Sequence, residues 1–260
     1  MKTGHWVCGL VCGGVLGVFA CVEQPQGYCQ IAQQQGQAHF AVYTDITPMK
    51  EGACAAKKLT AERIGFETYQ LPMQDKINIA WRTETLQQRF EEASKASHWS
   101  AEEEQEVSLT LNVLGEYSSK PDAENRCYAL NNGSNLDDPL LVEFSKTFEA
   151  AGTLPATTYT YGWRNVVVYS MPASPGQLVE GEVTYSIQEE GASEVCTGKY
   201  HFVALWPAYK CKSDEDCTPS VRGQEGSPIN PDFAGFLKCH EKGYCTVTLP
   251  PKELIEKLSK

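Results

Sequence analysis

The sequence lacks the features that most directly identify an enzyme or a nucleic-acid-binding protein. None of the motifs G-x-S-x-G, H-E-x-x-H, S-x-x-K or the Walker sequence occurs, and each would mark a known catalytic or phosphate-binding site. The C-x-x-C spacing of a redox-active dithiol is also absent. Basic residues are few: 22 Lys and Arg stand against 33 Asp and Glu, which gives a formal net charge of −11. An acidic surface without a basic cluster repels nucleic acid, so we expect no nucleic-acid partner.

Long hydrophobic runs are missing as well, apart from one near the start of the chain. Trp6 to Ala20 is uncharged and mostly apolar, and it follows the single basic residue Lys2. Fifteen residues span roughly 22 Å as a helix, which is less than the ~30 Å hydrocarbon core of a bilayer. We therefore expect residues 1–20 to be a removable signal peptide and not a lasting membrane span.

The leader ends in a sequence that resembles a bacterial lipobox, namely residues 18–21, Val-Phe-Ala-Cys. The resemblance implies that Cys21 becomes the new N-terminus and is acylated, and that fatty chains such as palmitate anchor the protein to the membrane. Phe19 departs from the usual small residue, and ordinary signal-peptidase cleavage after Ala20 is the alternative. By resemblance to enteric sorting rules, Val22 implies the outer membrane or the cell surface.

Eleven cysteines are present, and eight of them remain once the leader is removed and Cys21 is acylated. An even number is what a fully paired exported domain needs. We expect disulfides to use all eight: Cys29, Cys54, Cys127, Cys196, Cys211, Cys217, Cys239 and Cys245.

The disulfide partners stay open at this stage, with one pairing disfavoured and one preferred. An extended segment over 198–206 would hold Cys196 and Cys211 too far apart to pair. We favour Cys54 with Cys127 as a distant pair. Cys211/Cys217 and Cys239/Cys245 share the spacing C-x₅-C, which is longer than the two to four residues that usually separate paired zinc ligands. Disulfides are thus favoured over zinc, and we expect no metal and no cofactor.

Alternating apolar and polar residues predict a mainly β fold, with α+β as a possible variant. The expected architecture is one disulfide-stapled domain over residues 39–260, an antiparallel sandwich or barrel-like body with one minor helix, after a Gln-rich tether at 21–38. Because Cys29 lies within this tether, we expect it to fasten the tether to the folded body. A helix is predicted over 84–96, and Ser100 with Glu103 offers a second, shorter start. Strands are predicted at 39–45, 58–69, 76–82, 107–117, 165–170, 179–188, 198–206 and 244–249, and 251–258 is compatible with a terminal helical turn or two.

Several features together resemble a family of uncharacterised exported lipoproteins from myxobacteria and related predatory bacteria. They include the lipobox-like leader, Gly52-Ala-Cys54, Gly65-Phe-Glu-Thr-Tyr69, Ala204-Leu-Trp-Pro-Ala208 and Ile229-Asn-Pro-Asp-Phe233. The likeness covers most of residues 39–249. It implies a place outside the cytoplasm and implies no activity.

The residues that could act in catalysis or metal binding do not belong to a recognisable sequence motif. His39, His98, His201 and His240 belong to no motif, and His201 alternates as a sheet residue would. The acidic run 214–216 lacks calcium-loop spacing. Tyr159, Tyr161 and Trp163 alternate as core residues do, although they could form a binding surface. We expect a binding or structural module with a glycan or envelope-protein partner and not an enzyme; the alternative is a secreted hydrolase, with carbohydrate as one candidate substrate class.

Overall fold

The computed structural model describes residues 6–7, 22–23, 27–34, 36–72, 76–133, 137–171, 174–220 and 226–258. The predicted lipidation site, Cys21, lies outside these ranges, as does most of the predicted signal peptide. Across the described ranges, every helix is too short or too polar to cross a bilayer. Strands β1 (Trp6–Val7) and β2 (Val22–Glu23) form a small antiparallel pair of their own.

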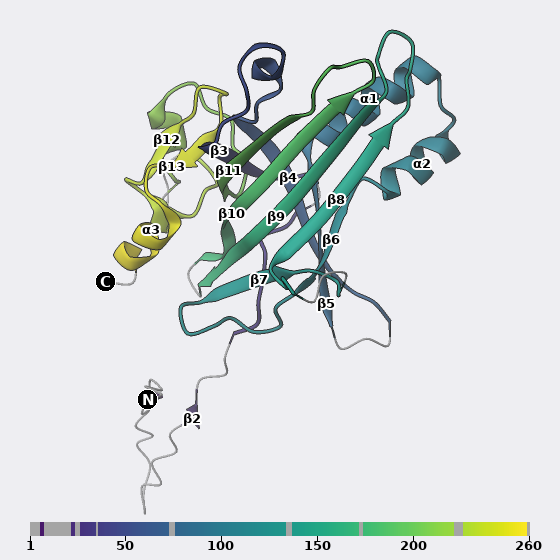
Figure 1. Ribbon diagram of the computed structural model, residues 1–260. Helices are drawn as coiled ribbons and strands as arrows, with labels where there is room; N and C mark the ends of the chain where they lie inside the picture. Colours follow the sequence, from purple (N-terminus) through teal and green to yellow (C-terminus); the bar gives the residue numbers. More distant parts are fainter. Residues whose placement is uncertain are drawn as a thin grey trace, which may run out of the picture.

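Nine further strands form one antiparallel sheet that closes on itself (Figure 1). Their order is β10-β11-β3-β4-β5-β6-β7-β9-β8, and β10 also pairs with β9. That additional pairing closes a ring of eight strands from β10 round to β9, with β8 attached to β9, so the barrel-like body is the alternative that the topology supports. The strands are β3 (His39–Thr47), β4 (Ala61–Gln70), β5 (Ile77–Thr83), β6 (Val113–Tyr117), β7 (Arg126–Leu130), β8 (Leu141–Phe148), β9 (Thr157–Met171), β10 (Ser174–Glu189) and β11 (Cys196–Leu205).

Strands β7 and β8 share one edge of the long strand β9. Strand β7 pairs with residues 167–169 of β9, and β8 pairs with residues 157–164. The opposite edge of β9 pairs with β10 along nearly its whole length. The predicted hairpin between the segments 179–188 and 198–206 is confirmed by the antiparallel pairing of β10 with β11.

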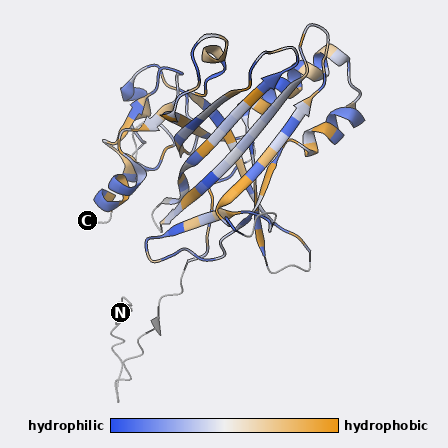
Figure 2. Ribbon diagram, viewed as in Figure 1, coloured by the Kyte–Doolittle hydropathy of each residue, from blue (hydrophilic) through white to orange (hydrophobic). Residues whose placement is uncertain are grey.

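Aromatic side chains fill the interior of the closed sheet. Tyr161 and Trp163 are fully buried, which confirms their expected place in the core. Trp163 contacts Trp81 edge to face with ring centroids 5.9 Å apart, and Phe202 in the same manner at 5.2 Å. Such contacts add to the large apolar area that these rings bury. Hydrophilic and hydrophobic residues alternate along the strands (Figure 2), as expected for a sheet with one buried face.

The helices are more numerous than the single minor helix expected. Helix α1 (Glu84–Ser97) agrees with the predicted helix, and the Thr83 side chain accepts a hydrogen bond from the backbone of Leu86 at its start. Helix α2 (Ala101–Leu109) begins at the capping box of Ser100 and Glu103. The strand predicted from 107 is therefore wrong before 113, because the capped helix continues through 109.

A C-terminal module, defined here as residues 208–220 and 226–258, packs beside the closed sheet (Figure 1). Its elements are η2 (Asp214–Cys217), η3 (Pro231–Phe233), β12 (Leu237–Cys239), β13 (Cys245–Val247) and α3 (Pro251–Leu258). The predicted last strand is thus shorter than 244–249. The module has its own apolar cluster, in which Phe233 and Leu254 join Leu178 and Leu205 of the sheet. A further 3₁₀ helix, η1 (Gly52–Lys57), follows β3.

Candidate functional site

All eight expected cysteines are joined in four disulfides. The pairs are Cys29–Cys127, Cys54–Cys196, Cys211–Cys239 and Cys217–Cys245. The favoured pair of Cys54 with Cys127 is wrong. Cys127 lies on β7 and bonds to Cys29, whereas Cys54 on η1 bonds to Cys196 at the start of β11. Cys196 and Cys211 have separate partners, as the spacing argument required.

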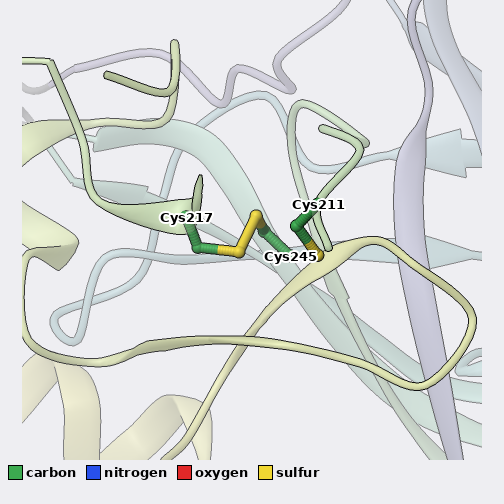
Figure 3. Close-up of side chains that lie close together, drawn as sticks. All are labelled: Cys211, Cys217 and Cys245. Atoms are coloured by element: carbon green, nitrogen blue, oxygen red, sulfur yellow. A yellow bond between two sulfur atoms is a disulfide. The ribbon is translucent and has the colours of Figure 1, made fainter. Parts of the chain in front are cut away.

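One group of cysteines in the described chain resembles a metal site by distance alone. The sulfurs of Cys211, Cys217 and Cys245 lie within 4.8 Å of one another. Figure 3 shows the bond between Cys217 and Cys245, with Cys211 beside it. Because each sulfur is held in a disulfide, none is a thiolate that could bind zinc.

The histidines are dispersed. His39 is buried and its Nε2 lies 3.2 Å from the carbonyl oxygen of Gly176. Burial lowers the pKa of His39 to about 4, so the ring is neutral near pH 7 and Nε2 donates to that carbonyl. His240 packs against Phe40, with the two ring centroids 5.5 Å apart. His98 takes the left-handed backbone conformation at the end of α1.

His201 comes nearest to a catalytic arrangement among the described histidines. It lies on β11 with Nε2 3.5 Å from Glu180 Oε2. The other oxygen of Glu180 accepts a hydrogen bond from Tyr169. Within the described chain, His201 forms no hydrogen bond with a serine or cysteine, so the pair lacks the nucleophile contact of a hydrolase.

The acidic run at 214–216 is used within the C-terminal module. Asp216 accepts hydrogen bonds from the backbone of Lys212 and Ser213, and Asp214 accepts one from the backbone of Cys239. The backbone donors lower the pKa of Asp216. These carboxylates therefore fix the loop geometry around the module's disulfides.

A buried carboxylate lies where α1 begins. Glu62 on β4 accepts hydrogen bonds from the Tyr43 hydroxyl (2.7 Å), the Thr85 hydroxyl (2.7 Å) and the Thr85 backbone (2.9 Å). Burial raises the pKa of Glu62, and these donors oppose the rise. The Glu62 carboxylate thus faces the positive end of the helix, where an anion is stabilising. Its role is to join α1 to the sheet.

The N-terminal segment, defined here as the described residues between 27 and 38, is fixed to the folded body. Besides the Cys29–Cys127 disulfide, the backbone of Ala32 donates to Gly176 at 2.9 Å, and Tyr117 donates to the carbonyl oxygen of Gln30 at 3.2 Å. Ile31 is 6% exposed. The expectation that Cys29 fastens this stretch to the body is confirmed.

A polar groove of about 750 Å³ lies between the N-terminal segment and strands β4 and β5. Its volume falls in the usual range of ligand sites, roughly 300–1,000 Å³. The lining is mostly polar and carries one basic residue, Arg82. The lining residues are Gln33, Gln34, Gly36, Gln37, Gly65, Phe66, Glu67, Ala80, Trp81, Arg82 and Asn112.

Arg82 is held in the groove by neutral partners. Its Nε donates to Asn112 Oδ1 at 3.0 Å, and its terminal nitrogens donate to Gln87 and Ser108. Burial lowers the pKa of Arg82, although an arginine stays charged near pH 7. Among the described residues it forms no ion pair. Its half-buried charge is therefore stabilised by neutral hydrogen-bond acceptors and not by a carboxylate, so it can still pair with an anionic ligand.

Comparison with known proteins shows the family of the chain. The model of the family described as MlpA matches residues 37–207, which are 171 of the 260 residues. The chain belongs to the MlpA family. No curated protein and no solved structure matches the chain.

The MlpA family region ends at residue 207, two residues after β11 ends. It therefore contains the whole closed sheet and the groove strands β4 and β5, while the C-terminal module lies beyond it. The family membership favours a lipoprotein-like envelope module.

The groove was not predicted from the sequence. The glutamines that line it belong to the stretch interpreted as a tether, and Arg82 closes a predicted strand without any motif. The signal in the sequence was Cys29, which indicated that part of the Gln-rich stretch lies against the body.

Proposed function

We propose that this protein is exported, is anchored to the outer membrane or cell surface by acyl chains on Cys21, and acts there as a binding module. Three facts support this. The chain belongs to the MlpA family, it holds four disulfides that need an oxidising compartment, and its described surface carries a polar groove.

The observation that carries the proposal is the fastening of Cys29 to the folded body. Cys29 follows Cys21 by only eight positions. Eight extended residues reach at most about 29 Å. An acylated Cys21 would therefore keep the end of the body that carries Cys127 close to the bilayer. The N-terminal wall of the groove begins at Gln33, four residues after Cys29.

The test is the intact mass of full-length protein extracted from membranes with non-ionic detergent. The expected product lacks residues 1–20 and carries acyl chains on Cys21. A Cys21→Ser variant should appear in the soluble fraction, and a Cys12→Ser variant, altered within the leader, should still be acylated. An unmodified Cys21, or a product that keeps its first twenty residues, would overturn the proposal.

A further inference from the structure

The groove beside Arg82 contains hydrogen-bond donors that have no acceptor among the described residues. Asn112 Oδ1 accepts from Arg82 Nε at 3.0 Å, and Gln33 Oε1 accepts from the Thr68 backbone at 2.9 Å. Because the two partners are N–H donors, the amide oxygens must face them, and the amide nitrogens remain as donors. Neither nitrogen makes a hydrogen bond to any residue that the structure describes.

Arg82 adds to this excess of donors. A guanidinium has five N–H groups. One on Nε, two on Nη1 and one on Nη2 are used by Asn112, Gln87 and Ser108, which leaves one N–H on Nη2 over. A ligand that completes these bonds must supply acceptors, and a carboxylate provides both the acceptors and the missing negative charge.

The groove also has space for a ligand beside Arg82, and one carboxylate in its lining can accept hydrogen bonds from ligand hydroxyls. Gly65 lies opposite Arg82 in the pairing of β4 with β5, and an added Cβ there would meet nothing within 4 Å. Two residues further along β4, the exposed Glu67 also lines the groove. A carboxylate such as Glu67 accepts hydrogen bonds, so it favours ligand hydroxyls. With one basic residue in the lining, the site suits a single carboxylate and not a polyphosphate.

We propose that this groove binds an acidic saccharide, with the sugar carboxylate at Arg82 and sugar hydroxyls at Glu67. Gln33 and Asn112 would donate their free amide N–H groups to the ligand. This inference rests on the proposed binding function and names its ligand class. The N-terminal segment then serves as one wall of the site, and the Cys29–Cys127 disulfide holds that wall in place.

The experiment titrates the acylated full-length protein in non-ionic detergent, after its mass has been verified, with three probes. These are a uronic-acid disaccharide, its methyl ester, and the matching neutral hexose disaccharide. The acid should bind, and the ester and the neutral sugar should bind at least about tenfold more weakly. Only the acid carries a negative charge that can form an ion pair with Arg82. Equal affinity for all three probes, or no binding of any, would overturn the inference and leave the lipid anchor unaffected.

Two variants locate the site. Arg82→Gln should weaken binding of the acid by about ten- to hundredfold, as expected for a lost charged hydrogen bond, and should remove the preference for the acid over the neutral sugar. Gly65→Leu should block the groove while leaving Arg82 and its contacts in place. Ser145→Leu, on an exposed position of β8 outside the groove, is the matched control and should bind as the parent does.

Three other outcomes are informative. If Arg82→Gln lowers the melting temperature strongly, because Gln87 and Ser108 lose their donor, then Gly65→Leu and the ester comparison test the inference in its place. If inorganic phosphate competes as well as the acidic disaccharide, the saccharide part of the inference is wrong. If Gly65→Leu binds the acid with unchanged affinity, the ligand lies elsewhere and the inference is overturned.

Discussion

Acidification should destabilise the protein through His39. In the folded protein this ring is buried against Phe66, and its Nε2 donates to the Gly176 carbonyl. Its pKa falls from 6.5 to about 4 on folding. Between these values the unfolded chain binds a proton that the folded protein excludes. Stability is therefore fully present above pH 6.5 and is lost as the pH falls toward 4.

The magnitude follows from the two pKa values. The full loss approaches about 3.4 kcal/mol, at about 1.36 kcal/mol for each pH unit. Between pH 7.5 and pH 5.5 the same linkage gives a loss of about 1.3 kcal/mol. The narrower interval is preferable for measurement, because most carboxylates stay ionised above pH 5.5.

The assay is urea denaturation of the parent and of His39→Gln at pH 7.5 and 5.5. Glutamine can still donate to the Gly176 carbonyl but does not titrate, so this variant should lose about 1.3 kcal/mol less than the parent over the interval. His201→Gln is the control, since the His201 side chain is 40% exposed on the outer face. If His39→Gln retains the full pH dependence of the parent, the reasoning about burial is refuted.

Three more changes test the packing. Replacing both Cys54 and Cys196 by Ala should lower the free energy of unfolding by about 5 kcal/mol, because their bond spans a sequence separation of 142; a loss below about 2 kcal/mol in urea titration would contradict this. Tyr43→Phe removes one of the donors to the buried Glu62 carboxylate and should cost about 1–3 kcal/mol by thermal unfolding, whereas an unchanged melting temperature would show that the hydrogen bond contributes nothing. Gly176→Ala would place a Cβ 2.3 Å from the backbone of the N-terminal segment, so limited proteolysis should cut that segment faster while the circular dichroism of the sheet stays the same; a resistant variant would refute the docking.

Local patterns predicted much of the sheet because alternation and capping act over short distances. The hairpin of β10 and β11 alternates clearly, and the helical spacing of Leu86, Phe90 and Ala93 indicated α1. The residue that caps this helix, Thr83, was identified only from the structure. The first half of β9 was missed as a strand although its aromatic residues were assigned to the core. Gly162 interrupts its side-chain pattern and weakens the local preference for a strand. Pairing with β8 and β10 on its two edges holds this stretch extended.

The sequence predictions failed where two local patterns favoured different structures, as in α2, and where no local pattern was present, as in the groove. Val107, Leu109 and Leu111 alternate as a strand would, yet the Ser100 capping box carries the helix through 109 and leaves Leu109 69% exposed. The groove depends on backbone contacts of the N-terminal segment with distant residues such as Gly176. Backbone hydrogen bonds leave no periodic pattern of side chains, so sequence alone could not place Gln33 beside Arg82.

The position of the Cys29–Cys127 disulfide has a mechanical consequence. Because Cys29 precedes the docked residues 30–34, a pull on the chain ahead of it passes through a covalent bond into β7. The hydrogen bonds of Gln30 and Ala32 then carry almost none of that load and are not peeled away one after another. Shear or thermal motion of a surface to which the chain is tied would leave the segment seated, and the space beside Arg82 would keep its shape under tension.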